Sequence, residues 1–154
     1  MGKESAGLVV YRKKEGRLEF LLVHPGGPFW RNKDEGAWTI PKGELGEGED
    51  PLTAAKREFE EELGIIVEGP FVELTPVKQK GGKLVRAWSA EKDCDVSQVS
   101  SNTFEMEWPP KSGRMSTFPE VDKADFFVMN EARRKVNPAQ IPLLQQTAEI
   151  AGGS

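Results

Sequence analysis

Residues 43–65, GELGEGEDPLTAAKREFEEELGI, carry the strongest structural signals in this chain of 154 residues. Pro51 suits the first position of a helix, because the N–H that it lacks would be unpaired there. Asp50 stands where an N-cap belongs, and Gly64 stands where a helix stops. Between them, apolar residues recur at helical spacing: Leu52, Ala55, Phe59 and Leu63. We therefore expect a Gly-rich loop followed by an amphipathic helix that ends before Gly64.

A second face of this helix is acidic. Glu58, Glu61 and Glu62 lie at i, i+3 and i+4, so they are neighbours on the helix surface. Like charges at this spacing repel, which destabilises the helix and predicts a raised pKa for at least one of these carboxyls without metal. Divalent cations such as Mg²⁺ bind oxygen ligands of this kind, often together with phosphates. The alternative is a solvated acidic face, but the coincidence with the loop, the cap and the apolar stripe favours a cation site.

The same stretch resembles the Nudix box, G-x5-E-x7-R-E-U-x-E-E-x-G-U, in which U is a bulky apolar residue. Every defined position is filled in register: Gly43, Glu49, Arg57, Glu58, Phe59, Glu61, Glu62, Gly64 and Ile65. The resemblance implies an α+β protein with the Nudix fold, a mixed β-sheet sandwiched between α-helices. It implies one domain over residues 1–154, with frayed ends at about 1–4 and 151–154.

Local patterns outside the box agree with a mixed α and β protein. The β-rich runs 6–11 and 18–24 flank KKEG and predict a hairpin. Further strands are expected at 71–79, 84–89, 104–108 and 125–129. The segment PPKSGRMSTFPEVDK should separate the last two strands, and helices are expected at 131–136 and Ile141–Ile150.

Composition limits the cellular location and the classes of partner that we expect for this chain. Cys94 is the only cysteine and cannot form an internal disulfide, which favours the cytoplasm. No apolar run approaches the roughly 18 residues of a membrane span, and the N-terminus lacks the layout of a signal peptide. Residues 43–65 carry eight acids and two bases, whereas the rest of the chain carries 17 acids and 19 bases. We therefore expect no membrane partner and no long nucleic acid.

The resemblance implies hydrolysis of a diphosphate bond in a nucleoside diphosphate joined to another group. Glu58, Glu61 and Glu62 would be the catalytic residues and would coordinate one to three Mg²⁺ ions, for which Mn²⁺ can substitute. A backbone carbonyl near Lys42 or Gly43 would help. Glu58 or a glutamate outside the box would accept the proton of the attacking water.

Other residues have supporting roles in this interpretation. The resemblance makes Arg57 a clamp that pairs with Glu49 or with a triplet carboxylate; the alternative is a surface arginine. Gly43 and Gly64 are expected in backbone conformations closed to residues with a Cβ. Lys42 is either a phosphate contact or a solvated lysine.

Three further positions complete the candidate site. Glu120 is either an additional metal ligand or base, or an ordinary loop charge. Phe29 and Trp30 are the favoured contacts of a nucleobase among six aromatic residues that include Trp38, Trp88, Trp108 and Phe118. His24 ends a strand and is assigned no catalytic role.

The substrate class rests on weaker signals. The runs Ser5-Ala6-Gly7, Glu19–Val23 in the second strand and WTIPKG ahead of the box resemble diadenosine polyphosphate hydrolases and bacterial NTP pyrophosphohydrolases. We expect a small nucleotide substrate, a dinucleoside polyphosphate or an NTP. The alternatives are an ADP-ribose or nucleotide-sugar pyrophosphatase, and a module on the same fold that binds a nucleotide without cleaving it. The sequence does not indicate an oligomeric state.

Overall fold

The expected hairpin is present in the computed structural model, which describes residues 3–97 and 101–152. Strand β1 (Glu4–Lys14) pairs antiparallel with β2 (Arg17–Pro25). The two-residue turn between them places both Glu15 and Gly16 in the left-handed region, with φ 52° and 77°. Both strands extend beyond the expected bounds, because their polar ends pair across the turn and their other ends pair with further strands of the sheet.

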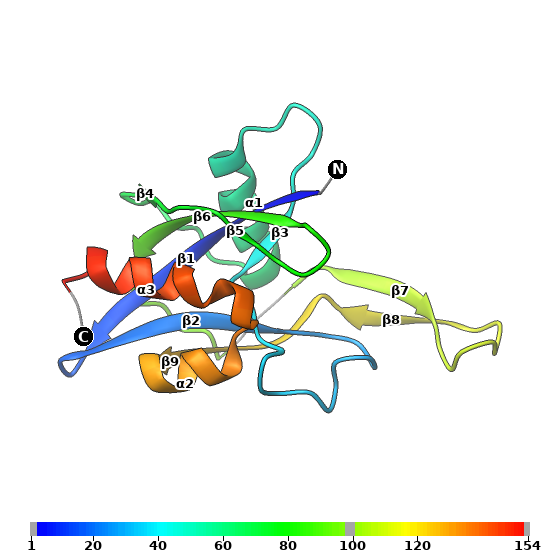
Figure 1. Ribbon diagram of the computed structural model, residues 1–154. Helices are drawn as coiled ribbons and strands as arrows, with labels where there is room; N and C mark the ends of the chain where they lie inside the picture. Colours follow the sequence, from blue (N-terminus) through cyan, green and yellow to red (C-terminus); the bar gives the residue numbers. More distant parts are fainter. Residues whose placement is uncertain (1–2, 98–100, 153–154) are drawn as a thin grey trace.

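A mixed sheet grows from this hairpin (Figure 1). The strands after the hairpin are β3 (Lys42–Glu44), β4 (Val72–Glu73), β5 (Val77–Lys78), β6 (Leu84–Glu91), β7 (Thr103–Glu107), β8 (Met115–Pro119) and β9 (Val121–Val128). The strand order of the sheet in the described residues is β4-β6-β1-β2-β9, with β3 beside β1 and β5 beside β6. The β1–β6 pair is parallel, and the other pairs of this sheet are antiparallel. The helices are α1 (Pro51–Leu63), α2 (Met129–Lys135), α3 (Ile141–Ile150) and the 3₁₀ turn η1 (Pro138–Gln140).

Helices cover both faces of the sheet, as the fold prediction requires. Alternate residues of β1 point to opposite faces. Leu8 packs in one apolar core with Phe59 of α1, and Val9 packs in a second core with Leu143 of α3. These four side chains are fully buried. The prediction of a mixed sheet between helices is confirmed.

Three local expectations were wrong. The expected strand 71–79 is divided into β4 and β5, with Pro76 between them, which has no N–H to donate to a ladder. The segment expected to separate the last strands contains β8, which pairs with β7 so that Phe118 lies opposite Phe104. This ribbon projects from the main sheet in Figure 1. The helix expected at 131–136 begins at Met129.

The predicted frayed segments include described residues that belong to β1 or to the core. Glu4 is the first residue of β1, and Ala151 is 8% exposed and packs in the core beside α3. The outermost residues of both expected frayed ends, 1–2 and 153–154, lie outside the described residues. None of the helices in the described part of the chain is long and apolar enough to cross a membrane.

Candidate active site

Helix α1 presents the acidic face, and both of its ends are fixed by side-chain or backbone caps. The Asp50 carboxylate accepts hydrogen bonds from the backbone N and the hydroxyl of Thr53, each at 3.0 Å. Gly64 ends the helix in the left-handed conformation with φ 71°, and its N–H donates to the Glu60 carbonyl. The predicted start and end of this helix are confirmed; of the predicted stripe, Ala55, Phe59 and Leu63 are buried and Leu52 is partly buried. Because that stripe faces the sheet, the glutamates lie on a face that the core does not cover.

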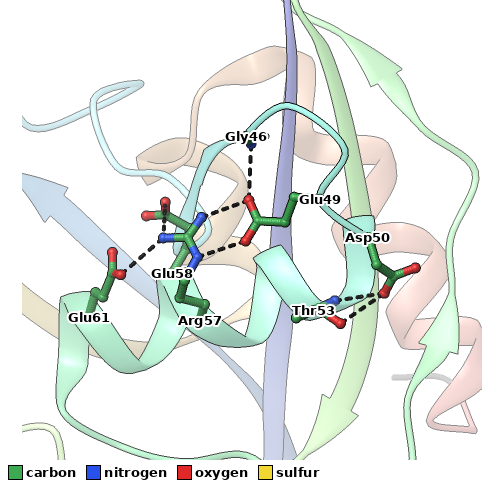
Figure 2. A network of polar contacts seen from close by, with 7 residues as sticks. All are labelled: Gly46, Glu49, Asp50, Thr53, Arg57, Glu58 and Glu61. Atoms are coloured by element: carbon green, nitrogen blue, oxygen red, sulfur yellow. Dashed lines mark hydrogen bonds and ion pairs between the residues drawn. The ribbon is translucent and has the colours of Figure 1, made fainter.

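Arg57 connects the Gly-rich loop to two glutamates of the triplet (Figure 2). Its guanidinium donates to both carboxylate oxygens of Glu49, at 2.8 and 3.0 Å. Its Nη1 also lies 3.1 Å from Glu58 Oε2 and 3.0 Å from Glu61 Oε2. Glu49 in turn accepts a hydrogen bond from the backbone N of Gly46, at 3.0 Å. Arg57 therefore makes both kinds of pairing that the sequence left open.

These hydrogen bonds shift the pKa values of Arg57 and Glu49 in opposite directions. Hydrogen bonds with Glu49 and then Glu61 raise the pKa of Arg57, so the guanidinium stays protonated. The hydrogen bonds from Arg57 lower the pKa of Glu49, which stays ionised. The Arg57 guanidinium thus offsets part of the repulsion among the carboxylates of the acidic triplet. The sequence alone suggested that an external ion would do so.

Gly43 lies directly against Glu58. A Cβ added at Gly43 would be 2.0 Å from Glu58 Cδ and 2.2 and 2.3 Å from its carboxylate oxygens. Gly43 belongs to β3 and is not among the glycines with positive φ. The expected reason for this glycine, an unusual backbone conformation, was therefore wrong. The absence of a side chain makes room for the Glu58 carboxylate instead.

The acidic face opens into a pocket of about 420 Å³, here named the acidic pocket. Its walls come from β3, α1 and the ends of the β7–β8 ribbon. The lining residues are Lys42, Gly43, Glu44, Glu58, Glu61, Glu62, Asn102 and Glu120. The structure therefore brings together Lys42, the acidic triplet and Glu120.

Charge and burial in the acidic pocket shift several pKa values. Burial, followed by the Glu58 charge, raises the pKa of Glu62 to about 8. Burial also raises the pKa of Glu58, against the opposing effect of Arg57. The direction of both pKa shifts agrees with the prediction for the triplet, but burial is a larger cause than the like charges on which the prediction rested. Burial lowers the pKa of Lys42, with Lys83 acting in the same direction and Glu62 against it.

Asn102 and Glu120 bring the β7–β8 ribbon to the acidic pocket. The Asn102 N–H donates to the Glu61 carbonyl at 3.2 Å, and the Glu120 N–H donates to the Asn102 carbonyl at 2.8 Å. The Glu120 carbonyl accepts from the Gly26 N–H at 3.0 Å, which ties the ribbon to the loop after β2. Sequence reasoning missed Asn102, because no motif surrounds it and its position depends on the unexpected pairing of β7 with β8.

The favoured aromatic residues, Phe29 and Trp30, pack edge to face with their ring centroids 5.0 Å apart. Phe29 is 64% exposed and is absent from the acidic pocket. Trp30 lines a neighbouring pocket of about 230 Å³, here named the tryptophan pocket, whose walls include Trp38, Gln79, Gln140 and Lys42. Lys42 thus lines both pockets and lies where they meet.

Trp38, Trp88 and His24 are buried, although Trp38 also borders the tryptophan pocket. Trp38 and Trp88 are buried core residues, at 6% and 8% exposure. His24 is buried, with Nδ1 2.8 Å from Asp122 Oδ1 and Nε2 2.6 Å from the Lys33 carbonyl. These contacts join β2 to the start of β9 and to the loop that carries Trp30.

The residues of the acidic pocket fit a magnesium ion by their chemistry. Within residues 3–97 and 101–152, no three acidic, histidine or cysteine side chains are already grouped closely enough to hold a metal. Arg57 holds the carboxylates of Glu58 and Glu61 in this arrangement. The available donors are nevertheless carboxylate oxygens, which Mg²⁺ prefers. A cation beside Glu62 would also offset the cost of ionising that buried carboxyl.

Comparison with known protein families identifies the family of this chain. The family model of the NUDIX domain matches residues 1–147. The chain belongs to the Nudix family. The Nudix box therefore runs from Gly43 in β3 through the following loop and α1 to Ile65, and the acidic pocket lies against it.

Individual Nudix relatives include tetraphosphatases. The asymmetrical bis(5'-nucleosyl)-tetraphosphatase of Caenorhabditis elegans is 45% identical over 65 residues, which are 42% of this chain and 43% of that protein. The chain thus matches less than half of that relative's length. The Rattus norvegicus protein of the same name is 35% identical over 109 residues, 62% of this chain and 70% of its own. A crystal structure of a C. elegans Ap4A hydrolase binary complex superposes with a TM-score of 0.67 at 27% identity, covering 97% of this chain and 98% of that one.

Proposed function

We propose that this Nudix protein is a magnesium-dependent hydrolase that cleaves a phosphoanhydride bond in a nucleoside polyphosphate. The observation that carries the proposal is the acidic pocket, in which Glu58, Glu61 and Glu62 face Glu120 and Lys42. An acidic pocket alone would repel a polyphosphate. Mg²⁺ reverses the local charge, polarises phosphoryl oxygens and lowers the pKa of a bound water.

Individual residues of the chain have separate roles in the proposed reaction. Glu58, Glu61 and Glu62 bind the metal, and Lys42 contacts a phosphate as a point charge. Glu58 or Glu120 accepts the proton of the attacking water, because both carboxylates line the same pocket. Arg57 and Glu49 keep the Gly-rich loop folded against α1 by their paired hydrogen bonds.

We propose a dinucleoside polyphosphate or an NTP as the substrate. The similarity to the C. elegans and R. norvegicus tetraphosphatases supports this class, as does the shape match to the C. elegans Ap4A hydrolase. The tryptophan pocket beside Lys42 supports a nucleoside end, because an aromatic face can stack on any base. The single cysteine supports a cytoplasmic location.

A pair of neighbouring variants tests the reaction. Glu61→Gln removes one carboxylate of the acidic pocket, whereas Glu60→Gln makes the same change at an exposed position of α1 that does not line this pocket. Phosphate or nucleotide release is measured with Mg²⁺ on diadenosine tetraphosphate, NTPs and ADP-ribose. We expect turnover of the first two classes by the wild type and by Glu60→Gln, and a loss of about 10²-fold or more in Glu61→Gln.

Three results would contradict parts of the proposal. No turnover of any compound would favour a binding module without catalysis. Full activity in Glu61→Gln would remove the acidic pocket from the reaction. A strong preference for ADP-ribose would change the substrate class and leave the site unaltered.

A further inference from the structure

A chain of side-chain amides lies behind the tryptophan pocket. Gln140 is completely buried in η1. Its Oε1 accepts a hydrogen bond from the backbone N of Ile40 at 2.9 Å, and its Nε2 donates to Gln79 Oε1 at 2.7 Å. Nε2 also donates to Thr39 Oγ1 at 2.9 Å. The chain therefore runs from the backbone just before β3 to Gln79.

The direction of these hydrogen bonds is fixed by the backbone. The N–H of Ile40 can only donate, so the Gln140 atom that faces it must be the oxygen. The amide nitrogen of Gln140 then faces Gln79, and the Gln79 atom that receives it must also be the oxygen. The remaining branch of the Gln79 amide is Nε2, whose two N–H groups take no part in the contact with Gln140.

Gln79 is also held at its backbone. Its N–H donates to the Lys83 carbonyl at 2.7 Å, and its carbonyl accepts from the Gly82 N–H at 3.0 Å. The turn after β5 thus positions the main chain, while Gln140 orients the side chain. Gln79 is half-buried and lines the tryptophan pocket together with Trp30 and Lys42. A donor held at both ends in this way loses little conformational freedom when a ligand binds.

We propose that Gln79 is the specificity-determining donor of a nucleoside subsite in the tryptophan pocket, with Gln140 as the residue that orients it. The ligand group is a hydrogen-bond acceptor of the base or ribose, and Trp30 supplies an apolar face for the base. The pocket volume of about 230 Å³ suits one part of a nucleotide, since pockets for larger ligands measure about 300–1,000 Å³. The phosphates then pass Lys42 toward the acidic pocket, a path that depends on the proposed function.

Binding of AMP tests this subsite without turnover, because AMP has no phosphoanhydride bond. Gln79→Met keeps the length of the side chain and removes the donor. Gln145→Met makes the same change at an exposed position of α3, away from the pocket. We expect Gln79→Met to weaken AMP binding in the presence of Mg²⁺ by roughly two- to tenfold, the effect of one neutral hydrogen bond. Tripolyphosphate binding should stay unchanged in both variants, and AMP binding should stay unchanged in Gln145→Met.

A spectroscopic measurement on the unaltered chain gives a second test. The side-chain NH₂ signals of Gln79 in a ¹⁵N–¹H spectrum are identified by their loss in Gln79→Met. They should move when AMP is added and stay in place when tripolyphosphate is added. Unchanged AMP affinity in Gln79→Met, unmoved Gln79 signals, or an equal loss of tripolyphosphate affinity would overturn the subsite. If AMP binding behaves as expected but no polyphosphate is hydrolysed, the subsite stands and the proposed reaction fails.

Discussion

Replacing Gly43 by Ala gives a local perturbation of Glu58 alone. The backbone at Gly43 does not require positive φ, so alanine can adopt it. The new methyl group would lie 2.0 Å from Glu58 Cδ, whereas real Cβ contacts essentially never fall below 3.0 Å. The carboxyl carbon of Glu58 must therefore move by at least about 1 Å.

The size of the effect differs between activity and stability. A misplacement of about 1 Å in a catalytic constellation costs on the order of 10²-fold in rate, and the 3.1 Å contact with Arg57 is lost as well. Overpacking costs about 1–3 kcal/mol of unfolding free energy. We expect the low end of that range, because the displaced atoms are the far end of a flexible side chain.

A double-mutant cycle with Glu58→Ala isolates this contact. Without the Glu58 carboxyl, the methyl group of Gly43→Ala loses the three close neighbours that oppose it. Gly43→Ala should therefore change urea unfolding in the wild-type background and leave it nearly unchanged in the Glu58→Ala background. Activity on diadenosine tetraphosphate is measured in parallel. Equal losses of stability in both backgrounds, or wild-type activity in Gly43→Ala alone, would refute the reasoning.

Three further predictions concern the surroundings of the site. Arg57→Lys cannot keep the paired contact with Glu49 and should lower the unfolding free energy by about 1 kcal/mol. This value allows for solvent screening, because the Arg57 side chain is 39% exposed. Unchanged urea unfolding would contradict the clamp. Because the pKa of Glu62 is raised to about 8 from an ordinary 4.5, the metal-free protein should lose stability as pH rises from about 4.5 to 8. Glu62→Gln should flatten that slope by about 1.4 kcal/mol per pH unit, as measured by urea unfolding with a chelator, and equal slopes in both proteins would speak against the raised pKa. Gly26→Ala would place a Cβ 2.0 Å from the backbone oxygen of Pro119, so thermal unfolding should show a loss of about 1–3 kcal/mol, and a wild-type transition would disprove the close approach.

Helix α1 was predictable because its determinants are local. The cap at Asp50, the first-turn Pro51 and the stop at Gly64 all act within a few residues of the helix ends. The β1–β2 hairpin was predictable for the same reason, since its turn and its two β-rich runs lie within one short segment. Strand β8 was not, because its mixed sequence forms a strand only through pairing with β7.

The candidate site shows the same limit. The box residues that converge lie on one helix or in the loop before it, and their spacing in the sequence was sufficient to group them. Asn102 and Glu120 reach the acidic pocket through backbone contacts with each other and with Glu61 that no sequence pattern shows. The amide chain of the tryptophan pocket joins Thr39 to Gln140, which is 101 residues away. Contacts of this separation depend on the complete fold.

Calorimetric titration of the protein with Mg²⁺, in a buffer that contains no phosphate compound, tests the central proposal most directly. The wild type should take up Mg²⁺ with a measurable heat, because the carboxylates of Glu58, Glu61 and Glu62 gain a cation that offsets their repulsion. A variant with all three changed to Gln should show no such uptake. Equal heats in the two proteins, or no uptake by the wild type of either Mg²⁺ or Mn²⁺, would contradict a metal-dependent site on this helix.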